Sequence, residues 1–496
     1  MNHELTIRTK NVCFNIFAIT FGFIINFIRK FNKKPEGLEN IPYISFISLL
    51  KILWAYFQQK NYDEVEDLVQ ELIGGHHDIY LSQFGIVLNN PEYAKILLTE
   101  SEDVAIKYYS KTDNVFFDKF FGCGLSLTNG DKWRSTRKLA DSALNLASHQ
   151  YPEVVGEITM DLFTFMNPNL NRPINIIEPM RRISIEALGK FAFGYKFGCL
   201  ESQEVPRLIS VYEYIVSVLG SPFRRVFPWI SELPLESNKK YLDAIKEFDG
   251  FINDIIETKR NEMKKDSYNG HDLLTSMIKQ GEINIDKHQL RDEIATFFTA
   301  GHDTTTTALS VSLYFLAKYP EMQEKARAEV IRILGNEPII PSLDQLKELK
   351  YVNAIIKETL RTHPPTPILT VRRLKKPIKV GSYILPINST CMINTWKIHR
   401  DPKYWENPNQ YNPERFLSSD EKRDKFAWIP FSAGPRNCVG QNLTLLQQRV
   451  VLSMFLLRYK WVLPENNVNK DKILLRSHFL LTPIDIKLVF TERINE

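Results

Sequence analysis

The sequence predicts a mainly α protein with a smaller β portion, built as one large domain. Apolar residues recur at helical spacing over most of the chain, whereas alternating, strand-like stretches are short. No Gly-, Ser- or Pro-rich linker and no internal repeat occurs between residues 60 and 490. The 496 residues are 44% hydrophobic and 24% charged, which is ordinary globular usage and excludes a disordered chain. Length alone suggests about three domains, but the absence of linkers favours one.

The predicted elements follow from these periodicities. We expect helices around residues 130–147, 174–197, 208–219, 238–264, 287–318, 320–334, 349–362 and 440–458. We expect strands at residues 78–89, 378–380 with 383–385, 390–394 and 484–490. Loops that contain Asn, Pro and Lys separate these elements, so the strands form only a minor part of a helical body.

An apolar segment precedes this body. Residues 11–28 carry no charge and are rich in Phe and Ile, and Arg29, Lys30, Lys33 and Lys34 follow at once. The run is close to the ~20 residues needed to cross a bilayer, and the basic cluster behind it places the rest of the chain in the cytoplasm. The alternatives are a signal peptide, which carries its basic residues before the apolar run, and a buried core helix. We therefore expect an anchor at residues 1–30, a connector and amphipathic lead-in at 31–59, and a catalytic domain at 60–496.

Charge and cysteine content exclude several other classes. Lys and Arg number 63 against 58 Asp and Glu, a net charge of +5, which is too small and dispersed for a nucleic-acid-binding surface. The five cysteines have neither metal-site nor redox-motif spacing. A disulfide scaffold or a zinc module is therefore not expected, and any functional cysteine must act alone.

The segment 292–320 predicts a helix that is apolar over most of its circumference and therefore buried. His302, Asp303 and the four threonines 304–307 lie in its middle. A run of β-branched residues is unfavourable in a helix, and a buried Asp needs a partner. The pattern indicates either a functional site or a helix that threonines bend for packing.

The segment FSAGPRNCVG, residues 431–440, ends where a helical pattern begins. Cys438 just before a helix start meets free N–H groups, which favour the thiolate. Gly434 and Gly440 permit tight turns and close approach of a flat ligand, Phe431 can cover the sulfur, and Arg436 can bind a carboxylate. These features are typical of a haem iron held by a thiolate, and the alternative is an inert, buried cysteine.

The same segment resembles the haem-binding signature of the cytochromes P-450, Phe-x-x-Gly-x-Arg-x-Cys-x-Gly. Further motifs of that family occur in family order: Trp133-x-x-x-Arg137, Ala300-Gly301-His302-Asp303-Thr304-Thr305, Glu358-x-x-Arg361 and Pro413-Glu414-Arg415-Phe416. The resemblance covers essentially the whole chain. It implies a single large haem domain after an N-terminal transmembrane helix.

The resemblance also implies roles for individual residues. Haem b would take Cys438 as its axial thiolate, with Phe431 and Gly440 beside it. Asp303 would relay protons inward, and Thr304 would hold the peroxide and a water. The propionates are assigned to Trp133, Arg137, Arg436 and Arg372, with the adjacent Arg373 as an open alternative. The structural brace of the cysteine loop is assigned to Glu358, Arg361 and Arg415.

The implied function is a monooxygenase that inserts one oxygen atom from O₂ into a lipophilic substrate. Its partners would be an NADPH–cytochrome reductase (a flavoprotein) and the lipids of the endoplasmic reticulum membrane, with Lys132, Arg134 and Lys138 as candidate reductase contacts. The alternatives are a reductase-independent haem-thiolate isomerase or dehydratase, and a non-catalytic haem sensor. The Asp303–Thr304 pair and the regular cysteine loop favour the monooxygenase.

Overall fold

The computed structural model describes residue 29 and residues 32–493, except 109–114, 269, 271, 282–286, 338, 418–422 and 478–479. The predicted anchor at residues 11–28 lies outside this part of the chain. No helix within the described residues is both long and apolar enough to span a membrane. The prediction of a mainly α protein with a smaller β portion is confirmed.

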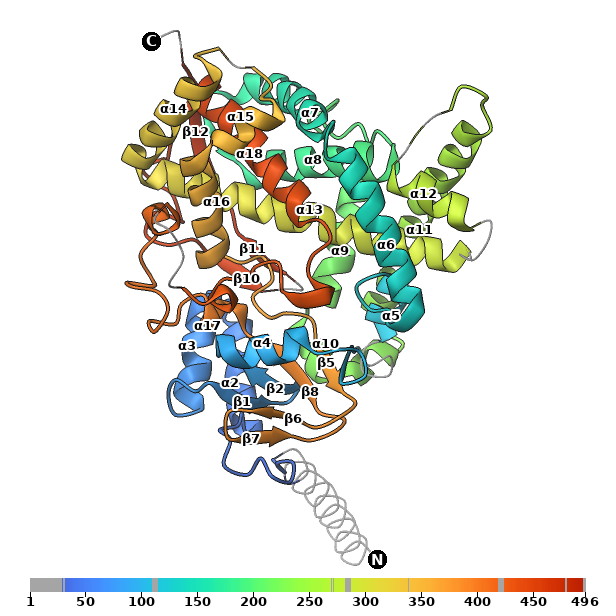
Figure 1. Ribbon diagram of the computed structural model, residues 1–496, viewed down its shortest axis with the longest axis vertical. Coiled ribbons are helices and arrows are strands. Elements are labelled where there is room, and N and C mark those ends of the chain that lie inside the picture. Colours follow the sequence, from blue (N-terminus) through green and yellow to red (C-terminus); the bar gives the residue numbers. More distant parts are fainter. Residues whose placement is uncertain are drawn as a thin grey trace, which may run out of the picture.

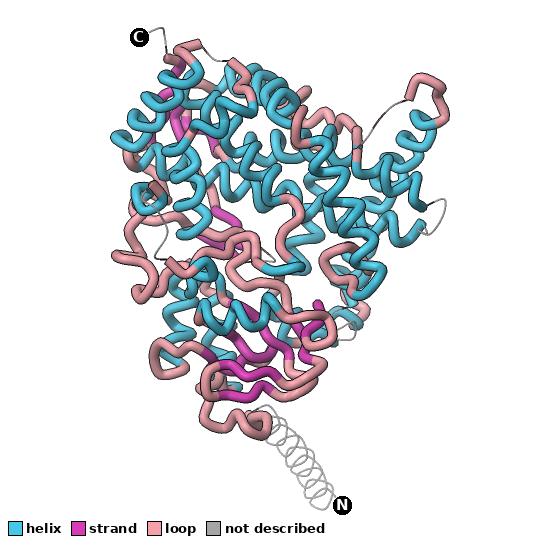
Figure 2. Tube along the Cα trace, in the orientation of Figure 1, coloured by secondary structure: helices cyan, strands magenta, loops and turns pink. Residues whose placement is uncertain are grey.

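Helices fill the larger part of the molecule, and the largest sheet lies at one end (Figures 1 and 2). The long helix α13 (Lys287–Lys318) runs through the helical part and packs against α5, α8, α11, α14, α16 and α18. The helices of this body are α5 (Val115–Phe121), α6 (Gly130–Ala147), α7 (Tyr151–Met166), α8 (Ile177–Leu188), α9 (Arg207–Leu219), α10 (Pro222–Val226), α11 (Glu236–Met263), α12 (Leu273–Gly281), α14 (Pro320–Leu334), α15 (Leu343–Glu348), α16 (Lys350–Thr362) and α18 (Gln441–Arg458).

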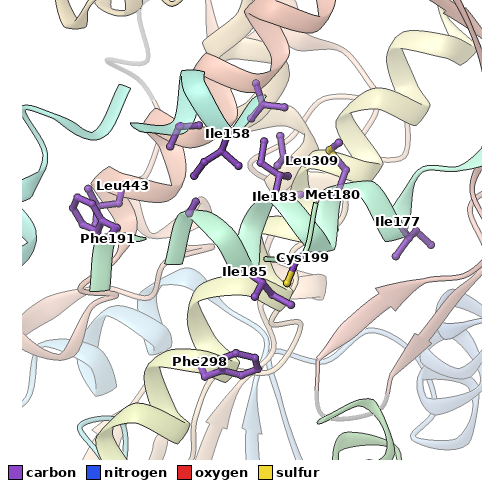
Figure 3. Packing of buried hydrophobic residues seen from close by; sticks show 14 of the residues in the cluster. Ile158, Ile177, Met180, Ile183, Ile185, Phe191, Cys199, Phe298, Leu309 and Leu443 are labelled. Atoms are coloured by element: carbon purple, nitrogen blue, oxygen red, sulfur yellow. The ribbon is translucent and has the colours of Figure 1, made fainter. Parts of the chain in front are cut away.

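The core of the helical body is continuous along α13. Met180 and Ile183 of α8 and Leu309 of α13 are fully buried together (Figure 3). Each fully buried side chain of this kind stabilises the fold by about 1.5–3 kcal/mol relative to its exposed state. An apolar surface around most of α13 therefore holds this helix at the centre, as its sequence predicts.

The threonine run does not interrupt α13. The hydroxyls of Thr304, Thr305 and Thr306 donate to the carbonyls of the residues four positions earlier, at 2.8, 3.3 and 2.8 Å. Each hydroxyl thus finds an acceptor within the helix instead of competing with it. The helix ends at Lys318, and Pro320 then opens α14, where a missing N–H costs nothing.

The five-stranded sheet has the order β1-β2-β8-β5-β3. Its strands are β1 (Ile79–Ser82), β2 (Gly85–Leu88), β3 (Ala105–Lys107), β5 (Arg372–Leu374) and β8 (Thr390–Ile393). Tyr80 and Val87 face the helices α2 (Phe46–Phe57) and α3 (Tyr62–Leu72). Ile79 and Ile86 face the opposite side, where α4 (Pro91–Thr99) packs, as the two-residue period of a strand requires.

The remaining strands form small sheets. They are the hairpin β6 (Ile378–Val380) with β7 (Tyr383–Leu385), the pair β10 (Leu475–Ser477) with β11 (Leu481–Pro483), and the three-stranded sheet β4 (Pro173–Asn175), β12 (Lys487–Glu492) and β9 (Tyr459–Val462). A short helix α17 (Thr395–Ile398) follows β8. The small sheets and α17 hold the long loops that lead toward α18.

Several predicted boundaries were wrong. Residues 78–89 form the hairpin β1–β2 instead of one strand, because the chain reverses before Gly85, whose φ is +131°. The predicted helix 174–197 begins only at Ile177, after β4, and ends in a π-helical turn at Gly189–Phe193. The last strand lies at 487–492, because residue 487 is where pairing with β4 begins.

Helix α7 was not predicted from the sequence. Its central Gly156 and the neighbouring β-branched residues have low helix propensity. Packing outweighs that preference, because Ile340 fills the space beside Gly156, where a Cβ would lie 2.4 Å from the isoleucine side chain. Helices α3 to α5 were not predicted either.

Candidate active site

The loop at residues 431–440 holds Cys438 just before α18. The Cys438 N–H donates to the carbonyl of Phe431 at 2.9 Å, which closes the loop. Gly434 has a φ of +71°, and a Cβ there would lie 2.2 Å from the carbonyl oxygen of Leu98, so only glycine fits. Helix α18 begins directly after Gly440. The chain therefore delivers the cysteine to a fixed position at the start of α18.

The environment of Cys438 differs from the sequence expectation in one respect. Cys438 is exposed, although many protein atoms lie near its sulfur. Burial raises the pKa of the Cys438 thiol, and the nearby N–H groups of Gly440 and Gln441 oppose this rise without cancelling it. The helix start alone therefore does not favour the thiolate. A bound metal would, because a coordinated thiol is deprotonated.

The oxygen motif of α13 borders the same region. Ala300 is exposed in the middle of an otherwise buried stretch of α13. The Thr305 hydroxyl bonds the hydroxyl of Thr444 at 2.7 Å, and Thr444 lies one turn after Gly440 in α18. This bond ties the turn that contains Ala300 and Thr304 to the helix start that holds Cys438.

Asp303 and Thr304 are adjacent in α13, but their side chains do not hydrogen-bond to each other. The Thr304 hydroxyl donates to the Ala300 carbonyl at 2.8 Å. The Asp303 carboxylate accepts from Tyr212 of α9 at 2.6 Å and lies 3.2 Å from His302 Nε2. Burial would raise the pKa of Asp303, but His302, Arg181 and the Tyr212 hydroxyl outweigh burial and lower it. The acid is thus ionised and held away from the alcohol.

Arg372 lies in a cluster of cations. It is 2% exposed, and its Nε and Nη2 atoms have no hydrogen-bond partner within the described residues. Lys107 lies opposite it in the β3–β5 pair. Burial, and then repulsion from Arg372 and Arg436, hold the pKa of Lys107 well below its usual value. Orphaned buried donors with repelling charges fit a bound anion, such as the propionates of haem.

Lys107 is a site residue that sequence reasoning missed. Its only signal was a lysine in the strand-like stretch Ala105–Lys107, which is too short to recognise. Arg373, the open alternative to Arg372, alternates to the other side of β5 and lies over the ring of Tyr108, 4.7 Å from its centroid. The two arginines therefore lie on opposite sides of β5, with Arg372 in the cationic cluster and Arg373 against Tyr108.

The other predicted propionate residues already have protein partners. Arg436 lies over the Trp133 ring at 4.2 Å and donates to Glu102 and to the Thr128 carbonyl, at 2.9 and 2.7 Å. Burial, and then the neighbouring Arg372, lower the pKa of Arg436 to about 10. Arg436 and Trp133 therefore border the cationic cluster.

Arg137 is directed at the cysteine loop. It donates to the carbonyl and side-chain oxygens of Asn437 at 2.7 and 2.9 Å and pairs with Asp141 at 2.8 Å. Because Asn437 directly precedes Cys438, Arg137 fixes the backbone beside the sulfur.

Glu358, Arg361 and Arg415 form one buried cluster. Glu358 and Arg361 are both 0% exposed and form a two-bonded pair, at 2.7 and 2.8 Å. Arg415 donates to the same carboxylate at 3.1 Å, and the Asn412 N–H does so at 2.8 Å. Every carboxylate oxygen is bonded, which a buried charge requires.

The cluster reaches the cysteine loop through His399. Arg361 donates to the His399 carbonyl at 2.8 Å, and the His399 Nε2 atom accepts from the Ile429 N–H at 2.8 Å. Burial, and then the charges of Arg361 and Arg400, lower the pKa of His399 to about 3, so its ring stays neutral and can accept. Ile429 lies two residues before the loop that carries Cys438.

Glu293 of α13 holds another loop at the site, and sequence reasoning did not single it out. It is 0% exposed and accepts from the Leu125 N–H at 2.8 Å. On the other side of this segment, Arg436 binds the carbonyl of Thr128. Burial raises the pKa of Glu293 to about 7.

Replacing Glu358 by Ala should destabilise the protein by about 3–5 kcal/mol, because two buried arginines lose their counterion. The same variant should fail to take up haem, because the brace of the cysteine loop is lost. Urea unfolding and haem content measure the two effects. Glu348→Ala, at an exposed glutamate of α15, is the control and should match the wild type. Full haem loading of Glu358→Ala would contradict the role of the cluster.

Replacing Glu293 by Gln should remove part of the pH dependence of stability. The folded pKa, about 7, lies above the unfolded value of 4.5. The contribution of Glu293 is therefore fully present below pH 4.5 and is lost as the pH rises to 7, by at most about 3 kcal/mol. Urea unfolding at pH 5 and pH 8 should show a smaller loss in Glu293→Gln than in the wild type or in Glu321→Gln, a surface control. Equal losses would refute the assignment.

Comparison with known proteins identifies the family. The family model described as Cytochrome P450 matches residues 42–490. Cytochrome P450 4V2 of Pongo abelii is 28% identical over 422 residues, which are 80% of this chain and 78% of that protein. A cytokinin hydroxylase of Arabidopsis thaliana is 29% identical over 77% of this chain and 74% of its own length, and cytochrome P450 4d2 of Drosophila melanogaster is 27% identical over 77% and 80%. The chain therefore belongs to the cytochrome P450 family of haem-thiolate monooxygenases.

Proposed function

We propose that this cytochrome P450 oxidises a lipophilic substrate with O₂ and with electrons that NADPH supplies through a flavoprotein reductase. Cys438 would bind the haem iron, and Asp303 and Thr304 would deliver protons. The observation that carries this proposal is the hydrogen bond between α13 and α18. It joins the turn that contains the exposed Ala300 and Thr304 to the helix start that holds the exposed Cys438.

The residues around Cys438 fit haem. Cys438 is exposed, and Gly440 lies so close that a Cβ there would be 4.0 Å from the sulfur. Arg372 and Lys107 would hold the propionates, with Arg436 and Trp133 beside them. When bound, the haem supplies O₂ binding and O–O cleavage, which a thiolate ligand favours. Arg137 contributes by fixing Asn437.

The protein's own part in the reaction is to bring protons to one side of the cofactor. The hydroxyl of Thr304 donates to the carbonyl of the exposed Ala300, so its oxygen can still accept a hydrogen bond from a water molecule. The ionised Asp303 next to it can take a proton and pass it on. A structure without this acid–alcohol pair would suit a haem isomerase or a sensor, so its presence favours the monooxygenase.

The substrate side is apolar. Phe297 of α13 is 8% exposed and belongs to the hydrophobic core. Phe298 packs on Phe248 and His302 in the core. Ile368 is partly buried against the cluster between α2 and the sheet. These contacts support a lipophilic substrate and do not select one.

The reductase is proposed to dock beside α6. Lys132 and Lys138 of this helix are exposed. Arg134 is a weaker candidate, because its guanidinium is paired with Glu102 and Asp131 at 3.0 and 2.9 Å. The two exposed lysines are suited to an acidic flavin domain. Turnover with the reductase should therefore fall steeply with salt, and a rate independent of salt would contradict this docking site.

The proposed membrane association combines the segment 11–28 with an apolar surface. Ile47, Leu50, Trp54 and Phe57 of α2 are 45–66% exposed, and their spacing places them on one helix face. Helix α10 contacts α2, and beside it Phe223 and Trp229 are 41% and 58% exposed. Exposed apolar patches of this kind mark a membrane or partner surface.

In a chain that begins at residue 32, replacing Trp54 and Phe57 by Asp should abolish co-flotation with endoplasmic-reticulum-like lipid vesicles. Two charges in the interface oppose the burial of apolar surface in lipid. The matched control carries Asp at Leu146 and Val468, which are equally exposed, each 62%, and should still float. Equal flotation of both variants would contradict the membrane surface.

Replacing Thr304 by Ala should uncouple the reaction. With reductase, NADPH and an oxidised lipid, the variant should still consume NADPH but release hydrogen peroxide, and product per NADPH should fall at least about tenfold. Thr304→Ser keeps the hydroxyl and should stay coupled. A tightly coupled Thr304→Ala would refute the role of Thr304, and the absence of any oxygenated product from the wild type over a broad lipid panel would refute the substrate class.

A further inference from the structure

Tyr212 links the acid of the oxygen motif to a different helix. It lies on α9, is 2% exposed, and donates its hydroxyl to Asp303 Oδ2 at 2.6 Å. Its ring packs edge-on against His302 and Phe298, with centroids 4.8 and 5.3 Å apart. The Tyr212 side chain is therefore held in one place, and its hydrogen bond to a carboxylate is of the strong, charge-assisted kind.

Tyr212 acts as a donor and not as a proton carrier. Burial, and then the charge of Asp303, hold the pKa of Tyr212 well above its usual value. The phenol therefore keeps its proton and directs it at Asp303 throughout the neutral range. A group that never ionises can restrain a carboxylate but cannot exchange protons with it readily.

His302 lies beside the other oxygen of the carboxylate. Its Nδ1 atom lies 2.5 Å from the Phe298 carbonyl, which can only accept, so Nδ1 carries a hydrogen. Its Nε2 atom lies 3.2 Å from Asp303 Oδ1 but forms no hydrogen bond within the described residues. The hydrogen bond from Tyr212 is therefore the stronger restraint on Asp303.

Asp303 is thus bonded through Oδ2 to α9, and its Oδ1 atom lies against His302. Arg181 of α8 is the other charged group that acts on Asp303, and it pairs with Glu178 and with Glu213 of α9. Thr304 meanwhile donates to its own helix. A proton can pass from Asp303 toward Thr304 only after the bond from Tyr212 is broken and the carboxylate turns.

We propose that Tyr212 is a positioning residue that locks the His302–Asp303 pair toward α9, so that proton delivery waits until α9 releases the carboxylate. The inference rests on the proposed role of Asp303 and adds a control element to it. Without substrate, the closed lock keeps protons from the reaction and limits wasted reductant.

The bond itself is tested by hydrogen exchange of the holoprotein, which needs no turnover. In Tyr212→Phe, the amides of residues 207–219 should exchange about tenfold faster, because a hydrogen bond to a charged group is lost. Tyr214→Phe is the matched control. Its hydroxyl, on the same helix, bonds only weakly to the Ser237 carbonyl, at 3.4 Å, and exchange should stay unchanged. Equal exchange in wild type and Tyr212→Phe would overturn the proposal.

The lock is tested by NADPH consumption with reductase and without substrate. Consumption should rise at least threefold in Tyr212→Phe and stay at the wild-type level in Tyr214→Phe. It should not rise when Tyr212→Phe is added to Asp303→Asn, since the freed group is Asp303. No rise in the single variant, or an equal rise in the Asn background, would overturn the proposal even if α9 exchanges faster. If Asp303→Asn oxidises substrate at the wild-type rate, the proton-delivery role of Asp303 fails, and the lock fails with it.

Discussion

The buried carboxylate of Glu358 is the interaction on which the position of Cys438 depends. Two arginines and a backbone N–H compensate this charge, and Arg361 also grips the carbonyl of His399. Through His399 the same set of bonds reaches Ile429, just before the cysteine loop. Charged groups buried at this depth tolerate little displacement, so they give a long irregular loop the rigidity that a regular helix has by itself.

The central helix α13 is held in position by a different constraint. Its apolar surface fixes α13 in the core, and the hydroxyls of Thr304 and Thr305 bond within the helix and to α18. The Asp303 carboxylate accepts from Tyr212 of α9 and lies against His302. The need to compensate this acid thus connects α13 to α9.

The sequence predicted the parts of this molecule that rest on long patterns or strict residue requirements. The α13 helix was recognised by its uniform apolar surface, and the cysteine loop by glycine, arginine and cysteine at fixed spacing. Lys107 was not recognised, because its role arises from strand pairing that brings it opposite Arg372. Tyr212 and Glu293 were missed for the same reason, since their partners lie far away in the sequence. Helix α7 was missed because packing around Gly156 outweighs its low propensity.

The most direct test of the account is the absorption spectrum of the reduced holoprotein under carbon monoxide. A cysteine thiolate opposite carbon monoxide shifts the Soret band of haem to longer wavelength. We predict this red-shifted band in the wild type and in Cys391→Ala, whose cysteine is buried in the sheet, and its absence in Cys438→Ala. An unshifted band in the wild type, or a shifted band in Cys438→Ala, would contradict the assignment of Cys438 as the haem ligand.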